Sequence, residues 1–147
     1  MPRPTQVSRE NLASLIRARG PISATELSAL LRVNRTTVVR RLSDFGNELV
    51  TLGATRSTRY LLRREIRNIG NRWPIYSLGD DGRPCEWAEL ESFDNRLWRI
   101  NWRGNPPEWA RFFTEDNGLW TGFPFFLGDT RPQGFLGRAI ASRISNT

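Results

Sequence analysis

The sequence predicts an α+β protein, with helices in its first half and short strands in its second. Residues 1–72 contain 14 arginines against five carboxylates, a formal net charge of +9, whereas residues 73–147 contain eight arginines against ten carboxylates, a net of −2. All six tryptophans lie in the second half. We therefore expect two domains, 1–68 and 69–147. The first has a surface suited to a polyanion, and the second has an aromatic core or interface.

Amphipathic helices are expected in the first domain, at Arg9–Arg19, Thr25–Leu31 and Arg35–Phe45. Ser23 and Glu26, three residues apart, form a capping box at the start of the second helix. Asn34 is a suitable N-cap for the third. The side chains expected to face the core are Leu12, Leu15 and Ile16 of the first helix, Leu27, Leu30 and Leu31 of the second, and Val38, Leu42 and Phe45 of the third.

A hairpin signal follows the third helix, with strands expected at Leu49–Leu52 and Arg59–Leu62 around a small, basic tip. Helix, turn, arginine-rich helix and hairpin in this order are typical of a winged helix-turn-helix DNA-binding domain. The third helix would lie in the major groove, with Arg40 as the best candidate for a bidentate contact to guanine. The predicted DNA-binding residues are Arg35, Thr36, Thr37, Arg40 and Arg41 on the helix and Arg56 and Arg59 on the wing.

The second half alternates apolar and polar residues between turn signals, a pattern typical of antiparallel strands. Strands are expected at Ile75–Leu78, Pro84–Leu90, Trp98–Arg103 and Leu119–Phe123. The tryptophan stripe of the third strand suits either stacking on a nucleic-acid single strand or one buried sheet face. We favour the buried face or a protein interface, because this half is net acidic. A short helix after Pro106-Pro107 is expected to point Trp109, Phe112 and Phe113 inward.

Neither catalytic chemistry nor a cofactor is expected. The chain contains no histidine, no lysine and one cysteine, Cys85. Within this chain, these absences exclude Ser-His-Asp and Cys-His nucleophiles, the usual zinc sites, and the phosphate-binding lysine of Walker loops and kinases. Acidic residues such as Glu86, Glu89 and Glu91 lie in or beside predicted turns, so we interpret them as solvated rather than as an acid–base pair. We therefore predict no catalytic, metal-binding or cofactor-binding residue.

The cellular compartment is inferred from what the sequence lacks. No apolar stretch reaches the length of a membrane span, and the N-terminus has no signal-peptide core. A lone cysteine favours a reducing environment. Together with the basic first half, these features predict a cytoplasmic, nucleoid-associated protein without membrane contact.

The stretch Phe123–Arg138 resembles a segment of the HipA-type serine/threonine kinase family, in its YjjJ-like branch. That branch carries an N-terminal helix-turn-helix region before the HipA fold, in the same order as the two halves here. The resemblance implies that residues 69–147 form the small, β-rich N-subdomain that precedes the kinase core. Because the catalytic and metal-binding aspartates of that core belong to later segments, the resemblance implies no catalytic residue in this chain.

The predicted function is sequence-specific binding of double-stranded DNA, as a transcription-regulating module of a HipA-like toxin–antitoxin protein without the kinase core. The alternative is a protein-interaction subunit that binds and regulates a HipA-type kinase in trans. The aromatic half is expected to dock on a kinase core, in the same chain or on a separate subunit, or to self-associate as a homodimer. The predicted contact residues are Phe125, Phe126, Phe135 and Leu136.

Overall fold

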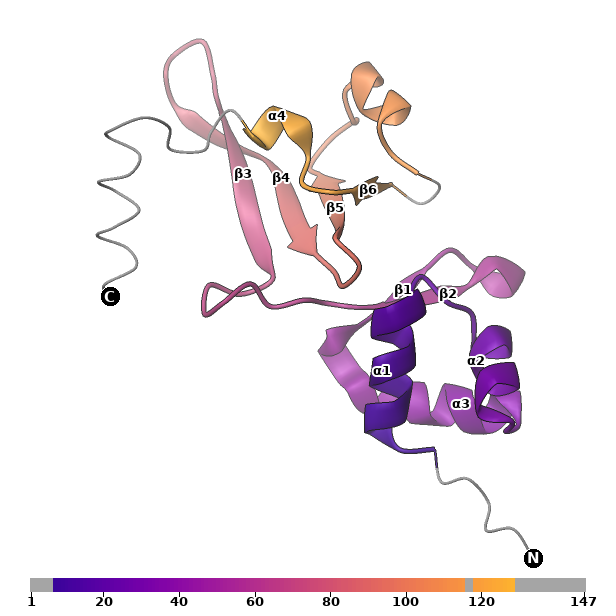
Figure 1. The fold of residues 1–147 in the computed structure, drawn as a ribbon. Helices are drawn as coiled ribbons and strands as arrows, with labels where there is room; N and C mark the ends of the chain where they lie inside the picture. The colour runs from indigo at the N-terminus through magenta and orange to yellow at the C-terminus, as the bar shows by residue number, and fades with distance from the viewer. Residues whose placement is uncertain (1–6, 116–117, 129–147) are drawn as a thin grey trace, which may run out of the picture.

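The computed structural model describes residues 7–115 and 118–128 of the chain. These residues form a helical unit, joined through a two-stranded hairpin to a four-stranded antiparallel sheet (Figure 1). The mixed helix-and-sheet fold confirms the α+β class that the sequence predicts.

The helical unit begins with α1 (Arg9–Arg19), α2 (Ala24–Leu31) and α3 (Arg35–Leu42). The expected capping box of α2 is present, since the backbone N–H of Ser23 donates to Oε2 of Glu26 at 2.8 Å and that of Glu26 donates to Oγ of Ser23 at 3.2 Å. Oδ1 of Asn34 accepts the backbone N–H of Thr36 at 3.2 Å, which caps α3. These side chains satisfy backbone donors that the first turn of a helix leaves free.

The third α-helix is three residues shorter than expected. After Leu42 the chain tightens into a 3₁₀ helix, η1 (Ser43–Glu48). Within η1, Gly46 has a φ of 52°, a value that favours glycine and that an α-helix does not allow. Phe45 nevertheless reaches the core, at 4% exposure.

The core of the helical unit consists of apolar side chains from all three helices. Most of the expected inward residues are buried, with Leu12, Ile16, Leu27, Val38 and Leu42 at 2% exposure or less. Leu30 is an exception, because 42% of it is exposed and the prediction that it faces the core is wrong. Helix α2 buries Leu27 in the core, and Leu31, the residue after Leu30, packs against this core while partly buried.

The hairpin consists of β1 (Leu49–Leu52) and β2 (Arg59–Leu62), joined through the short 3₁₀ turn η2 (Thr55–Ser57), and its strands have the expected bounds. Successive side chains of a strand point to opposite faces. Both faces of this hairpin are covered. Leu49, Tyr60 and Leu62 pack on the helical core, whereas Val50, Leu52 and Leu61 form a second cluster with Phe93, Leu97 and Leu119 of the sheet.

The sheet has the strand order β3 (Arg72–Leu78), β4 (Pro84–Ser92), β5 (Leu97–Trp102) and β6 (Leu119–Thr121). One of its faces is aromatic, with Trp98, Ile100 and Trp120 all at 7% exposure or less. The short elements η3 (Glu108–Phe112) and α4 (Phe125–Gly128) pack against this face. The tryptophan stripe is therefore part of a protein core, as the favoured interpretation of the sequence holds.

The prediction that Phe112 and Phe113 point inward is wrong. They are 84% and 53% exposed, and Ala110 is the buried residue of this turn. The reason is the type of helix, because a 3₁₀ helix has three residues per turn and turns a narrower stripe to the core than an α-helix does. Trp109 remains half-buried and packs at the edge of the aromatic cluster.

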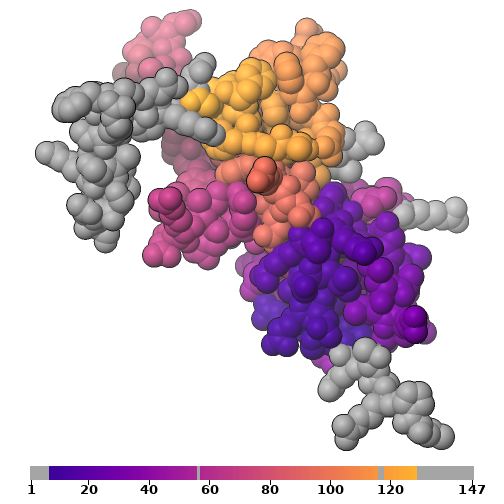
Figure 2. Space-filling view, in the orientation of Figure 1, coloured from indigo at the N-terminus to yellow at the C-terminus, as the bar shows by residue number. Residues whose placement is uncertain are grey.

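The helical unit and the sheet are in direct contact, besides being joined through the hairpin. The backbone N–H of Arg64 donates to the carbonyl of Ser92 at 3.0 Å. At the β4–β5 turn, Nδ2 of Asn95 donates to the carbonyl of Gly20 at 2.8 Å, beside the end of α1. In Figure 2 the atoms of this part of the sheet lie against those of α1. Together with the cluster around the hairpin, these contacts make the described residues one packed body.

The polar face of the sheet centres on Glu91, which is 1% exposed rather than solvated as expected. Its Oε1 lies 3.1 Å from Nη2 of Arg63 and 3.1 Å from Nε of Arg72. Its Oε2 accepts hydrogen bonds from Nε of Arg99 at 2.9 Å and from Nδ2 of Asn101 at 3.0 Å. Burial raises the pKa of this carboxyl, but the hydrogen bonds from Arg99, Asn101 and Arg63 outweigh burial and lower the pKa below its ordinary value.

Candidate nucleic-acid interface

Helix α3 presents a polar face to solvent. Val38 and Leu42 fix the opposite face in the helical core, at 0% and 2% exposure. Because side chains four residues apart share one face of a helix, this anchoring directs the remaining positions outward. The exposed residues of the outward face are Arg35, Thr36, Val39 and Arg40, and Thr37 is half-buried at its margin.

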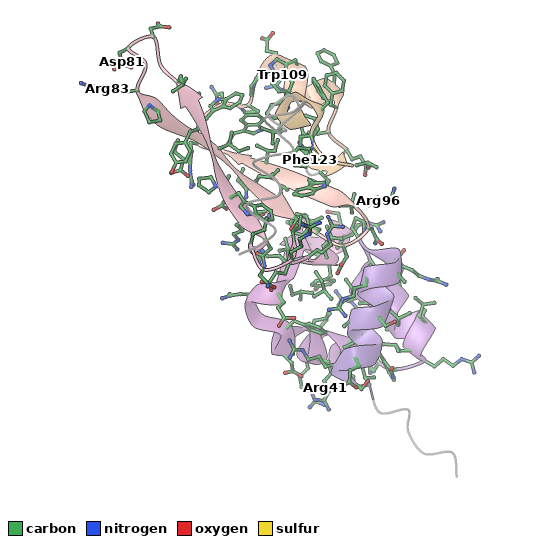
Figure 3. All side chains as sticks on the ribbon, turned by 60° about the vertical axis from the view of Figure 1, so that its left-hand side comes forward. Arg41, Asp81, Arg83, Arg96, Trp109 and Phe123 are labelled. Atoms are coloured by element: carbon green, nitrogen blue, oxygen red, sulfur yellow. The ribbon has the colours of Figure 1, made fainter. Side chains whose placement is uncertain are left out.

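The arginines of α3 differ in their partners. The guanidinium groups of Arg35 and Arg40 form no hydrogen bond or ion pair with any residue that the structure describes. Arg41 lies with its Nη1 3.5 Å from Oδ2 of Asp44, an exposed pair. An exposed pair of this kind contributes at most about 1 kcal/mol, so it leaves Arg41 able to exchange its partner. Figure 3 shows Arg41 at the end of the helical unit far from the sheet.

The two predicted wing arginines occupy different environments. Nη1 of Arg59 donates to the carbonyl of Pro21 at 3.2 Å and lies 3.5 Å from Oε2 of Glu26, so its side chain is held at the start of α2. Hydrogen bonds from Ser23 and the charge of Arg59 lower the pKa of Glu26, which keeps this carboxylate ionised beside the guanidinium. Arg56 belongs to η2 at the hairpin tip, and its side chain lies outside the described part of the structure.

Two features of this surface were missed by the sequence analysis. Val39 is 41% exposed on the outward face of α3, where an apolar side chain suits the methyl group of thymine. The sequence could have indicated this, because successive residues of a helix are about 100° apart, so that Val39 faces away from the core once Val38 is assigned to it. The second feature is a hollow between the starts of α2 and α3 and the hairpin. No sequence pattern indicates it, because its walls come from three separate elements.

The predicted protein-contact residues are not equivalent. Phe125 is 56% exposed, and its ring centroid lies 4.7 Å from that of the exposed Phe113. Phe126 is half-buried and packs 5.0 Å from the ring of Trp109 (centroid to centroid), as part of the aromatic cluster. Phe135 and Leu136 lie outside the described residues.

The described residues contain neither a metal site nor a membrane span. No group of three metal-ligating side chains comes together in residues 7–115 and 118–128. No helix in the same part of the chain has the length and apolar character needed to cross a bilayer.

The fold and this surface define a class of protein: an α+β chain in which an arginine-bearing helical unit packs, through its hairpin, on a sheet whose other face is aromatic. The family follows from comparison with known proteins. The family model of the YjjJ-like toxin middle domain matches residues 69–147, just over half of the chain. The chain therefore belongs to the YjjJ-like toxin family, which confirms this part of the resemblance.

A curated relative supports the same assignment. The chain is 32% identical over 127 residues to Toxin YjjJ of Escherichia coli (strain K12). The aligned part makes up 86% of this chain and 26% of that protein, so the chain spans about a quarter of the length of this relative. No solved structure matches the chain.

Proposed function

We propose that this chain is a sequence-specific module for binding double-stranded DNA, part of a HipA-like toxin–antitoxin protein, and that it acts by binding rather than by catalysis. Residues 1–68 would form a winged helix-turn-helix domain, and residues 69–147 would form a HipA N-subdomain-like segment. Such a module would regulate transcription and associate with the nucleoid. The family membership supports the toxin–antitoxin context.

One observation carries the proposal. Helix α3 exposes two arginines without a carboxylate partner among the described residues, and they flank Thr36 and Val39 on one face. In helix-turn-helix proteins, the second helix of the motif enters the major groove, where its exposed side chains contact base edges. Arg40 fits a bidentate contact to guanine, and Val39 fits a thymine methyl group. The net charge of +9 in residues 1–72 supplies the attraction to phosphates.

The test is quantitative DNA binding by the full chain. After selection of a preferred duplex from a random pool, fluorescence anisotropy should give a log–log salt slope of about −4 to −6, as expected for five or six neutralised phosphates. Arg40→Ala should weaken binding to this duplex by about 1–3 kcal/mol and should relax the base preference at one position.

Arg83→Ala is the matched control. It removes the same charge at the outer end of the β3–β4 hairpin, where Nε of Arg83 lies 3.6 Å from Oδ2 of Asp81 (Figure 3). Its affinity should stay close to that of the parent. If Arg40→Ala retains the parent's affinity and base preference, α3 is not the reading element. If the parent shows no salt-dependent binding, the function itself is wrong.

A second candidate function rests on the exposed phenylalanines. Phe112, Phe113 and Phe125 are each more than half exposed on the aromatic side of the sheet unit. Exposed groups of large apolar side chains mark protein interfaces. We propose a HipA-type kinase core as the occupant, in the same protein or in trans, because the stretch Phe123–Arg138 resembles a segment that precedes such a core in the HipA-type family.

Sedimentation and pull-down experiments test this second candidate function. The parent should bind a HipA-type kinase core or form a homodimer, and Phe113→Ser with Phe125→Ser should abolish that association. Tyr76→Ser, at another exposed aromatic residue of the sheet unit, is the control. A strictly monomeric parent without affinity for the core would leave the phenylalanines as ordinary surface residues.

A further inference from the structure

The hollow beside α3 has the chemistry of an anion site. Its volume is about 540 Å³, and it opens between α2, the first residue of α3 and the hairpin. Arg35 lines it from α3, Ser23 and Thr25 line it from the start of α2, and Thr55, Thr58 and Tyr60 line it from the hairpin. The lining therefore contains one guanidinium, four aliphatic hydroxyls and one phenol, but no carboxylate.

Several of these groups have donors to spare. The hydroxyls of Ser23 and Thr58 are engaged, since they donate to Oε2 of Glu26 at 2.7 Å and to the carbonyl of Thr55 at 2.9 Å. The guanidinium of Arg35 and the side-chain hydroxyls of Thr25 and Tyr60 form no hydrogen bond with the described residues. Donors that converge from separate elements without an acceptor suit a group that offers several oxygens and a negative charge.

The carboxylate of Glu26, which is hydrogen-bonded to the lining residue Ser23, does not oppose such a ligand strongly. Glu26 lies outside the lining of the hollow and accepts hydrogen bonds from Ser23. Arg59, which lies 3.5 Å from it, offsets its charge. Arg35 therefore supplies a positive charge that no lining residue cancels.

We infer that this hollow holds one backbone phosphate of the DNA that α3 reads, with Arg35, Thr25 and Tyr60 as its ligands. The inference rests on the proposed function. It follows from position, because the hollow lies between α3 and the hairpin, the two elements proposed to contact the duplex. A phosphate contact fixes the register of a protein on DNA but carries no base information. The site would thus set how α3 enters the groove, while Arg40 and Val39 read the bases.

The test uses conservative variants of the full chain on the selected duplex. Tyr60→Phe and Thr25→Val each remove one hydroxyl and keep the packing, and each should weaken binding about 3–10-fold, the range for one hydrogen bond. Arg35→Gln should weaken binding about tenfold or more and make the salt slope less negative by about one. All three should lose affinity equally on preferred and unrelated duplexes, unlike Arg40→Ala. Tyr76→Phe and Arg111→Gln, which make the same chemical changes at exposed positions of the sheet unit, should bind as the parent does.

Neutral methylphosphonates placed at each backbone position in turn make the test specific. One position should weaken binding by the parent but not weaken binding by Arg35→Gln or Tyr60→Phe any further. Salt-dependent binding without such a position, or with unaffected Tyr60→Phe and Thr25→Val, would overturn the phosphate site and leave the DNA-binding function standing. If inorganic phosphate competes with DNA beyond the effect of its ionic strength but no backbone position is coupled, the hollow is a free-anion site and the inference is wrong. A parent without DNA binding overturns both.

Discussion

Arginine plays two different parts in the two regions of this molecule. On the helical unit, Arg35 and Arg40 point to solvent and meet no carboxylate among the described residues. On the polar face of the sheet, three arginines converge on the buried carboxylate of Glu91. Arginine is thus left available on the outward face of α3 and fixed around Glu91. The partners of an arginine, rather than the number of arginines, indicate where a polyanion can bind.

The largest expected effect tests the fixed arginines. Glu91→Ala should lower the free energy of unfolding by about 3–5 kcal/mol, because it leaves partly buried guanidinium groups without their counter-charge. Urea denaturation at neutral pH measures the loss. Glu89→Ala is the control, since Glu89 lies on the same strand and its side chain forms no hydrogen bond or ion pair with the described residues, and its effect should stay within about 0.5 kcal/mol. Equal effects of the two substitutions would show that the ion-pair cluster around Glu91 contributes little to the free energy of unfolding.

The next effect tests whether the two regions are one cooperative body. Leu61 is fully buried in the cluster between the hairpin and the sheet. Leu61→Ala should destabilise by about 2–5 kcal/mol. Circular dichroism at 222 nm reports mainly on the helical unit, and tryptophan fluorescence reports only on the second half, which holds all six tryptophans.

The two signals should change at the same urea concentration in the parent and in Leu61→Ala. Leu78→Ala, at a residue that is 76% exposed, should leave both transitions where they are in the parent. Separate transitions in the parent would show that the helical and sheet units unfold independently and that the shared cluster does not couple them.

The smallest effect concerns pH. It compares two carboxyl groups, Asp94 and Glu91, whose pKa values are shifted in opposite directions. Burial raises the pKa of Asp94, against the attraction of Arg17 and Arg64, so the folded state binds its proton more tightly and this group gains stability as pH falls. The pKa of Glu91 is lowered, so its contribution is lost as pH falls below its ordinary value of 4.5. Asp94→Asn should therefore raise stability by up to about 1 kcal/mol at pH 7. Between pH 5 and 4 it should also make the loss of stability steeper, as urea titrations would measure. A shallower acid response in this variant would contradict the direction inferred for Asp94.

Local chemistry made much of this fold predictable. The capping pair Ser23 and Glu26 marked the start of α2, and the alternation around the tip at Gly53 gave the bounds of both hairpin strands. Such signals act over three or four residues, so one sequence is enough to show them. The outward face of α3 was predictable for the same reason.

Burial that depends on distant elements was not predictable. Glu91 stands in the sequence among other acidic residues, and its environment comes from Arg63, Arg72 and Arg99, which lie far apart along the chain. The hairpin likewise carries apolar residues on both faces, a pattern that indicates two covered sides but not what covers them. The sheet supplies that second cover only once the whole chain has folded.

A hairpin covered on both faces has a consequence for geometry. If α3 binds a duplex, the sheet cannot rotate about the hairpin without exposing the apolar cluster around Leu61 to solvent. The sheet would then leave the DNA in one fixed direction. Two copies bound a whole number of helical turns apart, about 10.5 base pairs per turn, would present their phenylalanines on the same side of the duplex. A spacing that differs by half a turn would place them on opposite sides, so the spacing of sites would govern which copies reach a common partner.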